Sequence, residues 1–338
     1  MIRRRLVDAL FRLVDEICSH ERGRSALRGA VRYATARERT RFSREALEEC
    51  PYPGMAVPTA ASEAGIRGVF LTGRFRTGST LLWQLFRAQR GVTAYYEPFN
   101  ERRWFDPGVR GGKVDGTHRG VAEYWQEYDG LEDLGRFYSD TWTYRSLYMN
   151  ENCWDPAMRR YIDIMLERAR GLAVLQFNRV DFRLAWLRFQ FPSVKMVHIY
   201  RHPREQWVST LHGDLDFPLD GTLQDFREVD KFYLCGWVED LRWSFPLLSG
   251  LEGEHPYLAF YLLWRLSFME GRQHADVSVS YESLAADPRL VFARILDRCG
   301  LSWDVDETVF GGVKGAAGPR HERYAPGEWY QRLETRAE

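Results

Sequence analysis

Residues 73–80 read Gly-Arg-Phe-Arg-Thr-Gly-Ser-Thr, a run with the glycine spacing of a phosphate-binding loop. Residues 67–72 before it form a short apolar strand candidate, and residues 81–86 after it have the pattern of a helix packed on a sheet. In this context backbone N–H groups and the positive helix end converge on an anionic oxygen. The run therefore predicts an anion site, with Arg74 and Arg76 adding positive charge beside it.

Ser79 occupies the loop position where a nucleotide hydrolase carries its lysine. Without that lysine the loop lacks the side chain that normally reaches the outer phosphates of ATP or GTP. The substitution therefore argues against nucleotide hydrolysis.

The composition is that of a globular chain, with 338 residues of which 45% are hydrophobic and 28% charged. Lys+Arg and Asp+Glu both number 47, and this balance argues against nucleic acid as the main partner. The five cysteines are widely spaced and form no CxxC pair, so neither a disulfide framework nor a zinc site is indicated. An anion site in this chain must therefore be local.

Residues 1–65 are expected to form a helical N-terminal extension, ahead of a single catalytic domain at residues 66–338. Residues 2–17 place apolar side chains on one helical face, which favours packing against the rest of the fold. A helix on a membrane surface is the alternative. We see neither a signal core nor a stretch long enough to span a membrane, and expect a cytoplasmic protein.

Further strand candidates follow, separated by helical stretches, at residues 92–97, 172–177, 194–200 and 277–281. Alternating strands and helices predict an α/β fold of the P-loop type, with a parallel sheet of about five strands and helices on both faces. Ligands of such sheets bind at the carboxyl ends of the strands. The residues expected there are Gly73, Glu97, Asn178 and Arg201.

The strand at residues 194–200 ends in Arg201, where a nucleotide hydrolase would favour an acidic residue to organise magnesium. Pro203 opens a helix after it, and Ser209 lies in that helix. Facing one crevice, Arg201 and Ser209 would together bind a phosphate without a metal.

These two segments resemble the sulfotransferases that use 3′-phosphoadenosine 5′-phosphosulfate (PAPS), and the loop is most similar to the carbohydrate-type and bacterial branches. The resemblance covers roughly residues 66–290. It implies PAPS as donor, adenosine 3′,5′-bisphosphate (PAP) as product, and no metal. The implied 5′-phosphosulfate residues are Arg74, Arg76, Thr77, Gly78, Ser79 and Thr80. Arg201 and Ser209 match the family's 3′-phosphate pair.

Some features depart from the cytosolic branch that acts on aromatic acceptors. That branch has lysine where Arg76 stands and a histidine base that we cannot place in this sequence. Its late glycine-rich nucleotide motif is only faintly similar to residues 313–320. The acceptor class is therefore less well defined than the chemistry.

Glu97, which precedes Pro98, is the candidate general base. A carboxylate delivered by a strand end into a cleft and flanked by aromatic rings suits removal of a proton from an acceptor hydroxyl. Carbohydrate-type sulfotransferases with a similar Glu-Pro turn use the glutamate in this way. The alternative is a structural glutamate that caps a turn or pairs with Arg102 or Arg103. Arg76 and the loop amides would stabilise the charge that develops on the leaving phosphate.

Acceptor binding is expected from two insertions near residues 100–155 and 213–256, which are rich in aromatic side chains. Aromatic faces stack on sugars and also line pockets for phenols or lipids, although many of these rings would be core. Trp104 and Arg179 are the named acceptor candidates. Alternative bases are His118, His198, His202 and His212, of which His198 lies within a strand and is expected to be buried packing.

The sequence thus predicts a sulfotransferase that moves a sulfuryl group from PAPS to a hydroxyl. The acceptor would be a carbohydrate or another glycosylated, lipid or natural-product molecule. A P-loop kinase using ATP and a nucleotide-binding protein without catalysis remain as alternatives.

Overall fold

The computed structural model describes residues 66–115, 118, 121–211, 217–302, 305, 307–313 and 319–337. The predicted N-terminal extension, and with it the proposed apolar helical face, lies outside the described residues. None of the described helices is long and apolar enough to cross a membrane.

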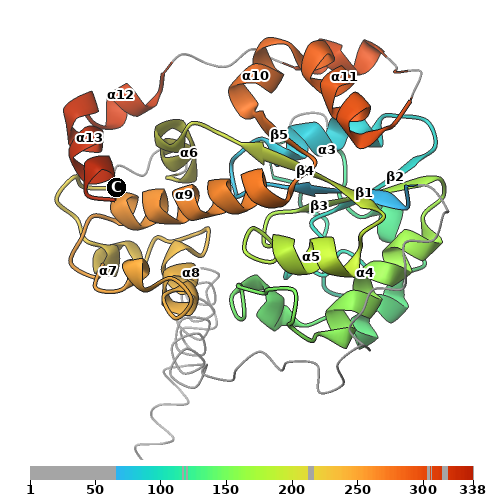
Figure 1. Ribbon diagram of the computed structural model, residues 1–338, viewed down its shortest axis with the longest axis horizontal. Helices are drawn as coiled ribbons and strands as arrows, with labels where there is room; N and C mark the ends of the chain where they lie inside the picture. Colours follow the sequence, from blue (N-terminus) through green and yellow to red (C-terminus); the bar gives the residue numbers. More distant parts are fainter. Residues whose placement is uncertain are drawn as a thin grey trace, which may run out of the picture. The chain divides into compact units, whose positions relative to one another are not determined.

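A five-stranded parallel sheet forms the centre of the described structure (Figure 1), as the sequence predicted. Its strands lie in the order β2-β3-β1-β4-β5. They are β1 (Gly68–Thr72), β2 (Val92–Tyr96), β3 (Leu172–Phe177), β4 (Val194–Tyr200) and β5 (Val277–Ser280). Every residue of β1 is buried, because β1 pairs with β3 and β4 and helices cover both of its faces.

Two strands end earlier than the sequence indicated. β2 ends at Tyr96, because Glu97 turns out of the extended region with a φ of 39°. β5 ends at Ser280, whose hydroxyl accepts a hydrogen bond from the Ser283 amide and caps the following helix. Local backbone geometry, which hydrophobic patterning does not report, sets both boundaries.

Helices cover both faces of the sheet (Figure 1). On one face lie α3, which contacts β1, β2 and β3, and α11, which contacts β4 and β5. On the other face, α9 packs against β4, β5 and α5. The described α-helices are α3 (Ser79–Arg87), α4 (Pro156–Arg168), α5 (Leu184–Gln190), α6 (Pro203–Thr210), α7 (Leu223–Phe226), α8 (Leu234–Leu241), α9 (Pro256–His274), α10 (Tyr281–Ala286), α11 (Pro288–Cys299), α12 (His321–Tyr324) and α13 (Gly327–Thr335).

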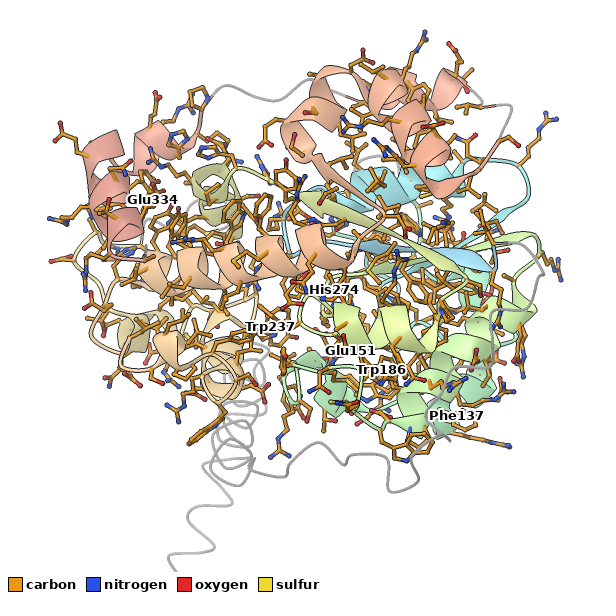
Figure 2. All side chains as sticks on the ribbon, in the orientation of Figure 1. Phe137, Glu151, Trp186, Trp237, His274 and Glu334 are labelled. Atoms are coloured by element: carbon orange, nitrogen blue, oxygen red, sulfur yellow. The ribbon has the colours of Figure 1, made fainter. Side chains whose placement is uncertain are left out.

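The insertions carry short 3-10 helices and much of the aromatic content, most of which lies in the hydrophobic cores or packs against them. These helices are η1 (Gln126–Tyr128), η2 (Glu132–Arg136), η3 (Asp140–Thr143) and η4 (Pro246–Leu248), with η5 (Glu307–Gly312) nearer the C-terminus. The rings contribute to two cores, one around the sheet and one among α6, α8, α9 and α13. Trp237 of α8 belongs to this second core (Figure 2), whereas Trp243 is half-exposed. Most of the aromatic supply therefore builds the fold.

His198 of β4 is buried packing, as predicted. Its side chain is 2% exposed, and its Nδ1 lies 2.5 Å from the Ser278 hydroxyl. Burial lowers its pKa to about 3, and the charge of Arg272 acts in the same direction. The ring is therefore neutral at physiological pH and packs directly against Gly271 of α9.

Gly271→Ala is predicted to destabilise the protein, because a Cβ at Gly271 would overlap the His198 ring. Overpacking of this kind costs ~1–3 kcal/mol and exceeds the ~1 kcal/mol that alanine gains in a helix. Gly236→Ala in α8 is the matched control, since a Cβ there has no neighbour within 4 Å. Urea unfolding of the variants would measure the difference. Equal stabilisation by both substitutions would contradict this account of α9 packing.

Candidate functional site

The glycine loop leaves β1 at Gly73 and enters α3 through Gly78. Gly78 has a φ of 89°, and a Cβ there would strike the Tyr281 ring, so the site requires glycine. Within the described structure, no side chain caps the start of α3, and its first turn contains no acidic residue. Its terminal amides and helix dipole are therefore arranged to receive an anion.

Arg76 connects the loop to the second motif. Its Nε donates to Ser209 Oγ at 3.1 Å, and Arg201 Nη1 donates to the Arg76 carbonyl oxygen at 3.3 Å. The structure thus brings Arg76, Arg201 and Ser209 together from two strand ends. Pro203 is the first residue of α6, as predicted, and the helix turns Ser209 toward the loop.

Charges of both signs lie around Arg76. Burial lowers the pKa of the Arg76 guanidinium, Asp115 raises it, and the nearby positive charges of Arg201 and Arg320 lower it again. Cations that disfavour one another's charge are stabilised when an anion binds between them. Arg201 also lies over the Tyr281 ring at 4.6 Å and 3.7 Å from Glu205, and its Nε makes no hydrogen bond among the described residues.

Arg74 points away from this cluster. Its guanidinium lies over the Trp237 ring at 4.9 Å and 3.8 Å from the Asp181 carboxylate (Figure 2 labels Trp237). Burial lowers the pKa of Arg74 and raises the pKa of Asp181 to about 6, although each charge favours the other. The Arg74 side chain therefore lies in the second core, and only its backbone belongs to the loop.

The three hydroxyl residues of the loop have different partners. Thr77 Oγ1 donates to the Arg74 carbonyl oxygen at 2.8 Å and closes the turn. Ser79 Oγ donates to Asn178 Oδ1 at 3.0 Å, and Thr80 Oγ1 lies 3.2 Å from the Tyr96 hydroxyl. Ser79 thus ties the loop to the end of β3.

Glu97 lies beside the loop, buried to 7% exposure, at the end of β2. Arg179 Nη1 donates to its Oε2 at 2.9 Å, and Asn100 Nδ2 donates to the same oxygen at 2.5 Å. Asn178 Nδ2 donates to Oε1. In the alternative that treats Glu97 as a structural residue, the sequence suggested Arg102 or Arg103 as its ion-pair partner. In the structure, Glu97 pairs with Arg179. Arg103 pairs with Asp140 instead.

Arg179 contacts a second carboxylate. Its Nη2 donates to Glu101 Oε2 at 2.8 Å, and its guanidinium lies over the rings of Phe75 and Tyr233 at 4.9 and 5.7 Å. Burial lowers the pKa of Arg179, but Glu101 and Glu97 raise it by more, so the net shift is upward. Arg179 is therefore a fixed cation in this site.

His118 reaches the site although nothing in the sequence distinguished it from the other histidines. Its Nε2 lies 3.4 Å from Thr80 Oγ1, and its Nδ1 lies 2.6 Å from the Tyr124 hydroxyl. Burial lowers its pKa, Asp115 and Glu97 act against that shift, and Arg76 adds to it. His202 instead stacks on His321 with ring centroids 5.6 Å apart. His212 lies outside the described residues.

Trp104 lies in the hydrophobic core, and Tyr281 lies at the site. Trp104 is 3% exposed and packs against Tyr96 and Tyr124, so its ring is part of the sheet core beneath the site. Tyr281 was not singled out as a site residue, yet its ring contacts both motifs, at Gly78 and Arg201. Its position directly after the last strand is the sequence signal that could have identified it.

No protein-family model matches the chain, and no curated protein matches it in sequence. Similar solved structures include the sulfotransferase domain of the Synechococcus PCC 7002 olefin synthase, at 16% identity, covering 80% of this chain and 93% of that one, with a TM-score of 0.39. Sulfotransferase STF1 from Mycobacterium tuberculosis H37Rv is 16% identical, with 81% and 77% covered and a TM-score of 0.44. Retinol dehydratase, solved with androsterone and the inactive cofactor PAP, is 18% identical, with 81% and 65% covered and a TM-score of 0.27.

Two of these three structures are named as sulfotransferases and the third as a retinol dehydratase. Because these identities are 18% or less and these TM-scores 0.44 or less, we infer the function of this chain from its own residues.

Arg179→Met is predicted to destabilise the protein by ~3–5 kcal/mol, because it leaves two carboxylates facing one another without their shared cation. Adding Glu97→Gln should restore part of the loss. Arg168→Met is the control, since the Arg168–Asp133 pair is exposed and should matter little. Guanidinium unfolding at pH 7 would measure all three. A loss no larger than that of Arg168→Met would contradict the assigned pairing.

Proposed function

We propose that this protein is a PAPS-dependent sulfotransferase that transfers the sulfuryl group to an acceptor hydroxyl. The observation that carries the proposal is the contact between the two motifs, in which Arg76 donates to Ser209 and receives a hydrogen bond from Arg201. A donor with one phosphate in the glycine loop and another near α6 would span this junction.

The residues present fit a nucleotide with two separate phosphate groups. The loop and the start of α3 offer backbone amides to the 5′ side. Arg201 offers a guanidinium whose Nε has no hydrogen-bond partner among the described residues, and Ser209 offers a hydroxyl, to the 3′ side. Tyr281 lies between the two positions. Binding of PAPS and PAP would therefore use the loop amides for one phosphate and the Arg201 and Ser209 side chains for the other.

The reaction we propose is an in-line displacement at sulfur. Glu97 accepts the proton of the acceptor hydroxyl as the hydroxyl oxygen bonds to sulfur. The bond between sulfur and the oxygen of the 5′-phosphate breaks, and the electron pair stays on that phosphate. Arg76 and the loop amides stabilise the negative charge that develops there, which is usually the largest single contribution to such catalysis.

Glu97 has neighbours that fit this role. Asn100, Asn178 and Arg179 hold its carboxylate in one orientation close to Ser79 and Thr80. Arg179 would balance the carboxylate before the reaction and contact the acceptor side of the site. We propose a carbohydrate or glycosylated acceptor, with a lipid or natural-product hydroxyl as the rival.

The same residues make an ATP-dependent kinase the weaker candidate. Ser79 takes the place of the loop lysine, and β4 ends in Arg201 rather than in an acidic residue. A nucleotide-binding protein without catalysis differs from the proposed enzyme only in what Glu97 does. Nucleotide binding separates a sulfotransferase from a kinase. Turnover in a Glu97 variant separates an enzyme from a protein that only binds the nucleotide.

Calorimetric titration tests the nucleotide assignment. We expect adenosine 3′,5′-bisphosphate to bind more tightly than ADP or Mg-ATP, and Arg201→Ala to weaken it about ten- to hundredfold. ADP should lose much less, because it lacks a 3′-phosphate. Arg272→Ala, an exposed arginine on α9, is the control. Preference for Mg-ATP, unaffected by Arg201→Ala, would refute the sulfonucleotide site and favour the kinase.

Glu97→Gln tests the base. Turnover of PAPS with a panel of glycoside and lipid alcohols should fall by about 10²–10⁴-fold, the usual contribution of a positioned base. Binding of the bisphosphate should be unchanged, because Glu97 lies on the acceptor side of the loop. Glu228→Gln, an exposed glutamate in the 213–256 insertion, is the control. Normal turnover in Glu97→Gln would rule out the base assignment.

A further inference from the structure

Arg179 is shared between two carboxylates of different exposure. Its Nη1 contacts Glu97 at 2.9 Å and its Nη2 contacts Glu101 at 2.8 Å. The side chains of Arg179 and Glu97 are 4% and 8% exposed, whereas that of Glu101 is 33% exposed. The sequence analysis assigned no role to Glu101, and the proposed reaction does not use it directly.

Tyr233 fixes the other end of Glu101. Its hydroxyl donates to Glu101 Oε1 at 2.7 Å, and so links the 213–256 insertion to the 100–155 insertion. Tyr233 has a φ of 63°, and Arg76 and Glu97 also have positive φ values. Of the five described non-glycine residues with positive φ, these three lie in or beside the candidate site. Such backbone strain concentrates where side chains must be held in place for function.

We propose that Glu101 and Tyr233 are positioning residues that balance the charge of Arg179 while Glu97 accepts a proton. This inference rests on the proposed role of Glu97 as the base. It adds a second carboxylate to the proton-transfer machinery, one that acts only through Arg179.

The physical reason is the burial of Arg179. When Glu97 takes up the hydroxyl proton, it loses its charge and ceases to neutralise the guanidinium. A buried cation without a partner is costly, so the reaction would be opposed if Glu97 were the only anion beside Arg179. Glu101 remains ionised and retains the cation. Protonation of Glu97 is therefore easier with Glu101 present than without it.

Other titratable groups lie near Glu97 and Arg179, and their titration has to be distinguished from that of Glu97. Burial raises the pKa of Tyr96 and of Tyr128 well above the usual value, so both phenols stay neutral in the assay range. Burial also raises the pKa of Tyr138, on which Arg179 acts in the opposite direction. Among the described residues, His118, Tyr124 and Tyr233 also interact with Glu97 or Arg179. His118 is the one whose titration would overlap that of a carboxylate.

The test follows the Glu97 carboxyl directly, in full-length protein saturated with adenosine 3′,5′-bisphosphate. Carbon-13 NMR of protein labelled at the glutamate δ-carbon reports its ionisation, and Glu97→Gln assigns the signal. In Glu101→Gln the titration midpoint should fall by about one pH unit, the effect of removing one nearby charge. In Tyr233→Phe it should fall by less, because Glu101 keeps its charge but is no longer held beside Arg179 by the Tyr233 hydroxyl. His118→Asn separates the histidine titration.

The rate of PAPS turnover with the panel of acceptor alcohols provides an independent measurement. We expect Glu101→Gln to slow this reaction about three- to tenfold through a weaker acceptance of the proton by Glu97. Glu228→Gln should leave both the midpoint and the rate unchanged. If Glu101→Gln does not fold, Tyr233→Phe and Glu101→Asp give the same test.

The outcomes separate this inference from the function on which it rests. A Glu97 midpoint identical in wild type, Glu101→Gln and Tyr233→Phe would overturn the charge-balancing role, whatever the turnover. A shifted midpoint with a Glu97→Gln variant that reacts normally would instead refute Glu97 as the base.

Discussion

Arg179 carries a positive charge into a part of the molecule where its side chain is 4% exposed, and the surroundings of the site are arranged around that charge. Glu97 and Glu101 contact it from the end of β2 and the turn that follows, and the rings of Phe75 and Tyr233 cover it. A buried cation needs such partners, because burial removes most of the water that would otherwise solvate its charge. This constraint fixes the orientation of the carboxylate that we propose as the base.

At the glycine loop, by contrast, two arginines lie close to one another. Arg76 and Arg201 lie together at the start of two helices, where burial and mutual repulsion lower the pKa of Arg76. Glu205 forms an ion pair with Arg201 at 3.7 Å, and Asp115 raises the pKa of Arg76, so carboxylates lie near both arginines. One half of the site thus holds a closely ion-paired arginine, and the other half holds two arginines close together. A neutral hydroxyl acceptor suits the first half, and an anionic donor suits the second.

Much of the fold was predictable because the signals are local. Continuous apolar runs such as residues 172–177 and 194–200 predicted buried parallel strands, and the structure has β3 and β4 there. The ends of β2 and β5 were not predictable in this way, since a positive φ at Glu97 and a serine cap at Ser280 set them. The Arg201–Ser209 spacing predicted a shared crevice because both residues belong to one strand-helix turn.

The sequence by itself determined the parallel α/β class, the glycine loop and the residues at the strand ends, since each depends on neighbours close in the chain. Only the tertiary structure decided that Arg74 turns into the second core and that Glu97 pairs with Arg179 rather than Arg102 or Arg103. It also brought His118 and Tyr233 to the site from the two insertions. These contacts join residues far apart in sequence, and the burial that selects among possible ion pairs exists only once the chain has folded.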